Sequence, residues 1–182
     1  MLFRSLFDPQ DDELLGSNDI LRYGLSTHPD MVSFLINTRG EILGGTSIPY
    51  KSPGGSPPVP PGPDQTPSGD PPPVPPPDDG MDRTRVTLIN NQDRGVYGIS
   101  VEGRDNVIHS TTMEKWDPIR KVWNPLTSGT LRSGSGARNL EIGVSPLELG
   151  LDLSQKDAFI AFVESTSWDR SSIDASDPGQ FM

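Results

Sequence analysis

The segment NLEIGV (139–144) places an apolar side chain at every second position. Successive side chains of a strand point to opposite faces, so Leu140, Ile142 and Val144 would share one buried face while Glu141 faces solvent. This alternation is typical of a strand whose sheet is covered on one side only. The segment therefore predicts an antiparallel sheet with one face in a core.

The same period of two recurs earlier in the chain, in MVSFLINT (31–38) and VYGISVE (96–102). Two recurrences are half-exposed strands, and two other segments, RVTLI and AFIAFV, are apolar on both faces and suit central strands. NVIHSTTMEKW is rich in β-branched residues, and KVW is its expected hairpin partner. The expected strands are 19–26, 31–38, 85–89, 96–102, 106–116, 121–123, 139–144 and 158–163, with turns at 90–95, 102–106 and 116–118.

One segment has the pattern of a helical turn. In SPLELG (145–150), Ser145 can cap the turn, Pro146 can take its first position, Glu148 stands three residues after the cap and Gly150 can end it. Everything else of length has the pattern of a strand, so the sequence predicts an all-β chain. Short, spaced strands with polar turns favour an antiparallel two-sheet β-sandwich of immunoglobulin or jelly-roll type.

A proline-rich tract interrupts these strands. Of the 20 prolines in the 182 residues, 14 lie between Pro49 and Pro77. Proline fixes φ and lacks a backbone donor, so the tract should be disordered, extended polyproline II rather than sheet. Only two expected strands precede it, and two strands are not stable alone. We therefore predict a single domain, residues 1–182, interrupted at 51–80 by a loop that is a spacer or a ligand for an aromatic groove.

Charge and composition exclude several classes of function. The chain has 25 acidic and 15 basic residues, a net charge of −10, so nucleic acid and anionic membrane surfaces would repel it. It contains no run of 18 apolar residues, and its amino terminus lacks the apolar stretch of a signal peptide. With no cysteine in the chain, disulfides and thiolate sites are excluded.

Catalytic patterns are weak. His28 and His109 are isolated in the sequence, and GISVEG (98–103) misses the spacing of a nucleophile elbow. Glu102 and Glu141 are one of many carboxylate pairs in an acidic chain. The GSG of residues 134–136 has the composition of a flexible loop, with no helix after it to hold a phosphate. We expect a protein that is not an enzyme.

The order of the elements resembles a known family. The opening FDPQDD (7–12), the strand MVSFLINT (31–38), the hairpin KWDPIRKVW (115–123) and above all NLEIGVSPLELGL (139–151) are similar to the glucodextranase-like C-terminal and DOMON-like β-sandwiches, relatives of the family 9 carbohydrate-binding modules. The resemblance implies a module of the kind found on secreted glycosidases and surface proteins, and therefore an extracellular or cell-surface location. The proline tract departs from the family pattern.

Tryptophans are the expected ligand platform. The apolar face of a pyranose stacks on an indole, while nearby polar side chains bind the sugar hydroxyls. One tryptophan lies in the polar segment STSWDRSS (165–172), and the other two flank the expected hairpin turn. The alternative is that these indoles are half-buried packing residues. The predicted carbohydrate-binding residues are Trp116, Trp123, Trp168, Asp169 and Arg170, with Arg120 and Lys121 as further polar neighbours.

Two acidic segments, at 8–13 and 173–179, form a candidate metal site. Calcium binds six to eight oxygen ligands, mostly carboxylates and carbonyls, without a rigid geometry. If the first and last strands end at the same edge of the sandwich, the two segments meet there. The alternative is a pair of solvated acidic loops, since no EF-hand spacing is present. The predicted calcium ligands are Asp8, Asp11, Asp12, Asp174 and Asp177.

Two functions agree with these features. The first is a non-catalytic binding module that recognises carbohydrate, either a polysaccharide or another cell-surface polymer. The alternative is a structural subunit of an extracellular assembly, such as a surface layer, tubule or filament. In that assembly the two strands before the tract would insert into a neighbouring copy, and calcium would strengthen the contact. We expect no nucleic-acid partner and no membrane insertion.

Overall fold

The computed structural model describes residues 4–7, 19–45, 80–154, 159–167, 173–175 and 179–181, and for the first and the last two of these ranges it describes the backbone alone. The predicted loop at 51–80 therefore lies outside the described residues, apart from Gly80. Within the described residues, no helix is long and apolar enough to cross a membrane.

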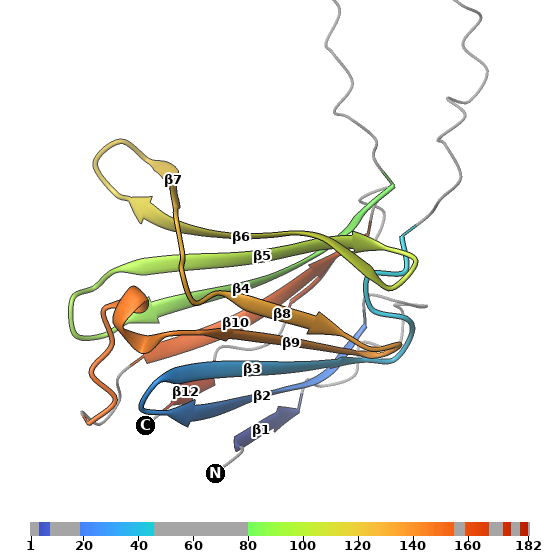
Figure 1. Ribbon diagram of the computed structural model, residues 1–182, viewed down its shortest axis with the longest axis horizontal. Coiled ribbons are helices and arrows are strands. Elements are labelled where there is room, and N and C mark those ends of the chain that lie inside the picture. Colours follow the sequence, from blue (N-terminus) through green and yellow to red (C-terminus); the bar gives the residue numbers. More distant parts are fainter. Residues whose placement is uncertain are drawn as a thin grey trace, which may run out of the picture.

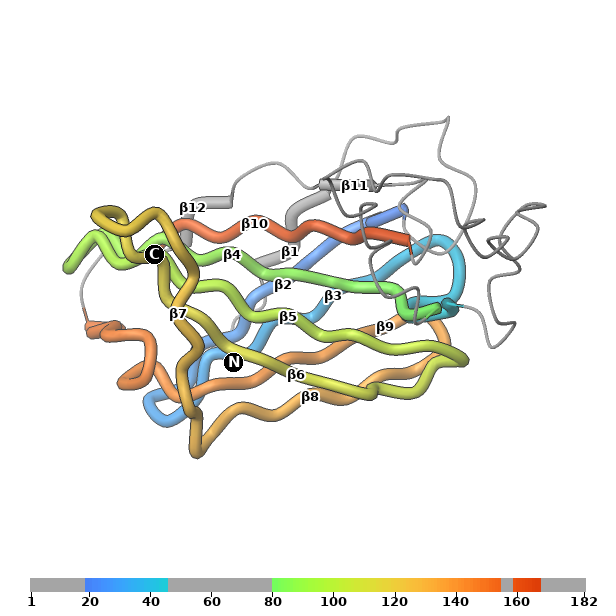
Figure 2. The backbone as a smooth tube through the Cα atoms, turned by 90° about the horizontal axis from the view of Figure 1, so that it is seen from above, coloured from blue at the N-terminus to red at the C-terminus, as the bar shows by residue number. Residues whose placement is uncertain are grey.

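The strands form two antiparallel sheets (Figure 1). The smaller sheet consists, in order, of β1 (Arg4–Phe7), β2 (Ile20–His28), β3 (Met31–Thr38), β9 (Asn139–Val144) and β8 (Arg132–Ser135). The larger sheet consists of β11 (Ile173–Ala175), β10 (Phe159–Thr166), β4 (Asp82–Asn90), β5 (Val96–Arg104), β6 (Val107–Asp117) and β7 (Val122–Leu126), with β12 (Gly179–Phe181) also paired to β10. Seen from above, β10, β4, β5 and β6 run side by side over the smaller sheet (Figure 2). The predicted all-β, antiparallel two-sheet sandwich is confirmed.

The core lies between the sheets, at the positions that the period of two assigns to it. On β3, Val32, Phe34 and Ile36 are fully buried. On β10 alternate residues are buried, while Ile160 and Phe162 lie half-buried on the outer face, so this strand is less enclosed than its apolar sequence suggests. The other predicted core residues, all buried, are Tyr97, Ile99, Val101, Leu140, Ile142 and Val144.

Strands from both sides of the proline tract share the smaller sheet. β3 pairs with β9 from Val32 opposite Val144 to Asn37 opposite Asn139.

Gly45 and Gly80, the residues that flank the segment 46–79, are in close contact. Gly45 has a φ of 51°, and a Cβ at this position would lie 2.5 Å from the Gly80 carbonyl oxygen. The Gly45 N–H also donates to Asp82 Oδ2 at 2.7 Å. Only a glycine accepts this close approach, and it fixes the two ends of the segment 46–79 side by side.

Strand β8 corrects the prediction of a flexible loop at 134–136. Gly134 and Ser135 pair with Glu141 and Leu140 of β9. The sequence RSGS has no apolar side chain, so its pattern could not reveal a strand that is held by backbone pairing at a sheet edge. The structure also adds β1, β11 and β12, which the pattern did not indicate.

The predicted helical turn is a single 3-10 turn, Pro146–Leu149, which Gly150 ends in the left-handed region. The predicted capping box is wrong, because the Ser145 side chain makes no capping hydrogen bond. Glu148 instead accepts hydrogen bonds from the Ser128 hydroxyl and from the Gly129 N–H, the latter at 3.1 Å. The Ser128 hydrogen bond lowers the pKa of Glu148. These contacts fasten the crossover between β7 and β8, and with it the end of β7.

Candidate functional site

Outward-pointing side chains of the larger sheet form rows that cross its strands. The register aligns Ile160 with Ile89, Ile89 with Val96, and Trp116 with Trp123. By the same register Val96 lies beside Trp116. All five side chains are half-buried. They make an apolar band across the outer face of the larger sheet, at the end where β4 finishes.

The opposite end of this face carries charges. Arg83 pairs with Glu102, and its Nε donates to Glu102 Oε1 at 2.8 Å. The Ser110 hydroxyl donates to the other oxygen of Glu102 at 3.0 Å. Exposed ion pairs of this kind contribute little to stability. The outer face is therefore divided into an apolar band and a polar end.

The two tryptophans of the apolar band stand directly opposite each other on the β6–β7 hairpin. The ring centroids of Trp116 and Trp123 are 5.4 Å apart, and the ring planes are inclined by 57°. Aromatic pairs at this distance attract each other beyond their buried area. The predicted hairpin partner is confirmed, and the structure brings these two predicted binding residues together. We call them the tryptophan pair.

The hairpin turn is fixed by Asp117. Its Oδ1 accepts the Ile119 and Arg120 N–H groups at 2.9 and 3.0 Å. Lys121 closes the turn with a φ of 55° and donates its N–H to the Asp117 carbonyl at 2.8 Å. Arg120 and Lys121 therefore lie in the exposed turn, three and two residues before Trp123.

Arg85 reaches the tryptophan pair from β4, across β5 and β6. Its Cζ lies 4.2 Å from the centroid of the Trp123 ring, a cation–π contact. Its Nη1 donates to Ser100 Oγ and to Glu114 Oε2, both at 3.0 Å. The side chains of Arg85 and Glu114 are only 18% and 27% exposed, so this ion pair is shielded from solvent more than most. Sequence reasoning missed Arg85, because RVTLI was interpreted only as a central strand.

Gly98 creates the path for the Arg85 side chain. A Cβ at Gly98 would overlap the Arg85 guanidinium, with Nη2, Cζ and Nε as its nearest neighbours. A glycine inside a strand often marks such a close approach. The glycine between Tyr97 and Ile99 was therefore the one sequence signal that a long side chain crosses β5 here.

The resulting site has the groups of a binding surface. It combines two half-buried indoles, one cation and one carboxylate that neutralise each other, and the Ser100 hydroxyl. The guanidinium covers part of the Trp123 ring, so a stacking ligand would use the remaining exposed surface of the two indoles. Such a surface suits an uncharged ligand with an apolar face and hydroxyls at its rim.

Lys115 stands at the edge of the core, on the inner side of β6. Its Nζ donates to the Tyr97 hydroxyl at 3.0 Å and lies 3.6 Å from Asp93 Oδ2. The Tyr97 hydrogen bond raises the pKa of Lys115. A lysine acts as a nucleophile or base when its pKa is lowered, so this lysine is held in the charged, unreactive form.

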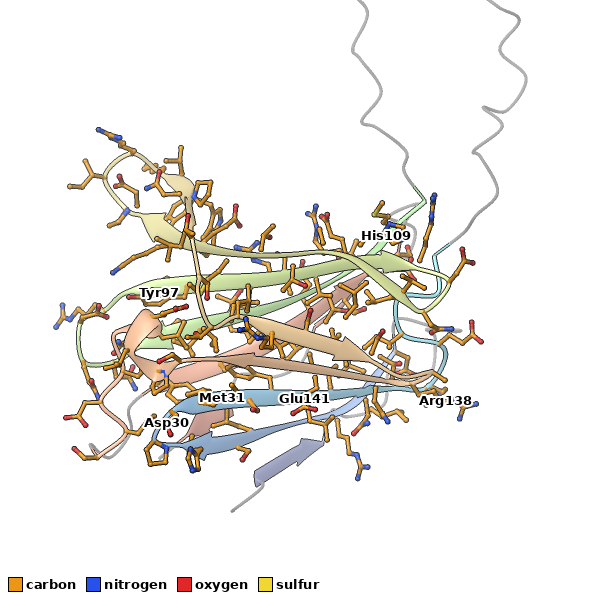
Figure 3. The ribbon with its side chains drawn as sticks, viewed as in Figure 1. Asp30, Met31, Tyr97, His109, Arg138 and Glu141 are labelled. Atoms are coloured by element: carbon orange, nitrogen blue, oxygen red, sulfur yellow. The ribbon has the colours of Figure 1, made fainter. Side chains whose placement is uncertain are left out.

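The carboxylates and histidines considered for catalysis do not gather at one place. Glu102 lies on the outer face of the larger sheet, whereas Glu141 lies on the outer face of the smaller one. His28 is exposed and its Nδ1 lies 3.6 Å from Asp30, at the turn between β2 and β3. Figure 3 places Asp30 and His109 at opposite ends of the molecule. These four residues cannot form a common site.

The remaining predicted sugar-binding residues, Trp168, Asp169 and Arg170, lie outside the described residues. β10 ends at Thr166, opposite Arg83 of β4. β10 therefore ends at the polar end of the outer face, away from the tryptophan pair.

Most of the predicted calcium ligands also lie outside the described residues. The exception is Asp174, which belongs to β11 and pairs with Ser165, so residues 173–175 are strand and not loop. Where the structure describes side chains, it gathers no three histidine, aspartate or glutamate residues that could hold a metal ion.

Comparisons of the chain with protein-family models, with curated proteins and with solved structures found no match. The resemblance to the glucodextranase-like and DOMON-like sandwiches therefore stays a prediction, and the site is interpreted from its own geometry.

Proposed function

We propose that this chain is a non-catalytic binding module that recognises carbohydrate, as a polysaccharide or a cell-surface glycan. The observation that carries the proposal is the tryptophan pair on the outer face of the larger sheet. Trp116 and Trp123 are half-buried and directly opposed, and Arg85 holds one of the rings. The family resemblance adds an extracellular or cell-surface location, as a domain beside a hydrolase or within a surface protein.

The affinity expected of such a surface is modest. Stacking on an indole together with a few hydroxyl hydrogen bonds corresponds to a Kd of about 0.1 to 1 mM, or roughly 4 to 5.5 kcal/mol. The net charge of −10 disfavours anionic polymers, so neutral glycans are the first choice of ligand.

Replacement of the tryptophan pair should abolish glycan retention. We expect Trp123→Ala and Trp116→Ala each to remove binding to the retained member of a panel of α-glucan, β-glucan and chitin, because either change takes away half of the stacking surface. Affinity gel electrophoresis measures the retention. Each substitution should lower the free energy of unfolding by about 1 to 2 kcal/mol, since both rings are half-exposed.

Ile119→Ala is the matched control. Ile119 is 91% exposed in the turn of the same hairpin, so its loss changes the hairpin surface without touching the tryptophan pair. This variant should bind like the wild type. Trp168→Ala tests the other predicted platform in the same assay. If both tryptophan-pair variants are retained like the wild type, the proposed binding site is wrong. If the wild type binds no member of the panel, the proposed function is wrong.

A second function, a structural subunit of an extracellular assembly, is favoured by one observation. β2 and β3 precede the tract in sequence and complete a sheet with β9, which follows it. The same two strands inserted into a neighbouring copy would link chains into a polymer. Light scattering after size exclusion separates the two functions: a monomer favours the binding module, and an open-ended series of masses favours the assembly.

Calcium should stabilise the chain if Asp8, Asp11, Asp12, Asp174 and Asp177 share a metal ion. A ligand that binds only the folded state adds RT ln(1 + [L]/Kd), about 2.7 kcal/mol at a hundredfold excess over Kd. Thermal unfolding in calcium and in chelator measures the difference. Equal melting temperatures in calcium and in chelator would contradict the metal site. Equal particle masses by light scattering in the two conditions would contradict a role of calcium in assembly.

A further inference from the structure

A notch adjoins the tryptophan pair at the place where β7 ends. It has a volume of about 280 Å³ and lies between β6, the end of β7 and the crossover to β8. β7 pairs only with residues 113–117 of β6, so the preceding edge of β6 opens into the notch. The notch is close to the lower limit of the volumes usual for small-molecule sites, roughly 300 Å³.

The lining of the notch is divided between polar and apolar groups. Thr112 and Glu114 are among its polar lining residues, and Pro125 and Leu131 are among its apolar ones. No basic side chain lines it. A pyranose ring has the same division, with apolar C–H faces and a rim of hydroxyls, so the lining fits an uncharged sugar better than a charged one.

Two of the polar groups in the notch are already engaged, and two remain for a ligand. Thr111 Oγ1 lies 2.6 Å from Ser133 Oγ, and the Ser128 hydroxyl donates to Glu148. These contacts fix the wall of the notch. By contrast, the exposed Thr112 hydroxyl makes no hydrogen bond within the described residues.

Glu114 connects the notch with the tryptophan pair. Arg85 binds its Oε2 at 3.0 Å, while its Oε1 makes no hydrogen bond to any described residue. Glu114 stands opposite Pro125 in the register, and the next outward pair along the hairpin is Trp116 with Trp123. Outward pairs two residues apart are separated by about 7 Å, so adjacent rings of one glycan chain would meet the two places in turn.

We propose that the notch is a second carbohydrate subsite, which takes an uncharged pyranose ring next to the ring that stacks on the tryptophan pair. The proposal rests on the proposed function and deepens it: the ligand is a neutral chain of at least two sugar rings. Thr112 and Glu114 bind hydroxyls of the second ring, and the lining, which has no basic side chain, offers no partner to the carboxylate of a uronic acid.

The test compares chain lengths by isothermal titration, with glucose or N-acetylglucosamine against the tetrasaccharides of α-1,4-glucan, β-1,4-glucan and chitin. The wild type should bind one tetrasaccharide at least about tenfold more tightly than its monosaccharide, a gain of about 1.4 kcal/mol. Thr112→Phe fills the mouth of the notch at an exposed strand position that tolerates an aromatic residue, and should reduce tetrasaccharide affinity to that of the monosaccharide.

Thr27→Phe is the control, the same substitution at an exposed position of β2 in the smaller sheet. It should bind every chain length like the wild type. If Thr112→Phe also does so while Trp123→Ala loses binding, the notch proposal is overturned and the proposed function stands. If Trp123→Ala and Trp116→Ala both bind like the wild type, the site at the tryptophan pair and the notch proposal fall together.

Charge selectivity gives a second readout. The wild type should not bind the tetrasaccharide of polygalacturonate, whereas Glu114→Gln releases the Arg85 guanidinium from its ion pair and should gain this binding. Equal affinity of the wild type for the neutral and the uronate chain would overturn the assignment of Glu114 to the subsite.

Discussion

Removal of residues 1–50 is expected to abolish cooperative unfolding of the remaining chain. The truncation takes away β3, which lies between β2 and β9 in the smaller sheet. It removes the fully buried Phe34, and with it Tyr23, whose hydroxyl donates to the Ala161 carbonyl at 3.2 Å across the core. Only β9 and β8 would remain to cover the larger sheet, and two strands do not hold together alone. Urea and thermal unfolding followed by circular dichroism should show no sigmoidal transition.

A matched internal deletion should leave the fold intact. Replacing residues 54–77 with a short Gly/Ser loop removes most of the proline tract and keeps every described strand. The ends of the segment already lie side by side at Gly45 and Gly80, and Gly45 is bound to Asp82. The cost of loop closure changes only logarithmically with length, so the effect should be on the order of 1 kcal/mol.

The pair of variants decides the domain organisation. A folded truncation would show that residues 80–182 form a domain without the first strands, against the single interrupted domain. A deletion that unfolds would show that the tract is part of the structure and not an insertion. The expected contrast, an unfolded truncation and a folded deletion, is the signature of strands completed across an internal loop.

The fold was predictable wherever burial follows a period of two. Val32, Phe34 and Ile36 alternate with half-exposed neighbours and are buried together in the structure. The sequence did not predict β8, because a strand made of arginine, serine and glycine has no apolar face. Only its hydrogen bonds to β9 define it. Pattern reasoning detects strands that contribute side chains to a core, and it does not detect strands that contribute only backbone.

The candidate site was predictable only in part. The hairpin expected at 116–118 was enough to bring Trp116 and Trp123 together, because residues that flank a short turn are cross-strand neighbours. The contribution of Arg85 depends on contacts between β4 and β7, which no local pattern reports. The notch depends on the residue at which β7 stops pairing with β6. The sequence pattern alone does not show where this pairing ends.

Asn90→Ala is expected to cost about 3 kcal/mol, the largest effect among single substitutions of polar residues in this fold. Asn90 is fully buried at the end of β4. Its Nδ2 donates to the carbonyls of Leu149 and Gly150 at 3.0 and 2.8 Å, and its Oδ1 accepts the Gln92 N–H at 2.8 Å. The side chain therefore joins the β4–β5 turn to the 3-10 turn, and alanine leaves buried polar groups without partners. Urea unfolding measures the change in free energy.

Two further variants separate this network from a general loss of packing. Asn124→Ala makes the same substitution at an exposed position of β7 and should change stability by less than about 0.5 kcal/mol. Asn90→Asp keeps the shape and the acceptor for the Gln92 N–H but places a carboxylate oxygen against two carbonyl oxygens. At neutral pH it should therefore lose at least as much stability as Asn90→Ala. Were Asn90→Asp as stable as the wild type, the two carbonyl contacts would contribute nothing, and the link between the turns would have to come from the surrounding apolar side chains.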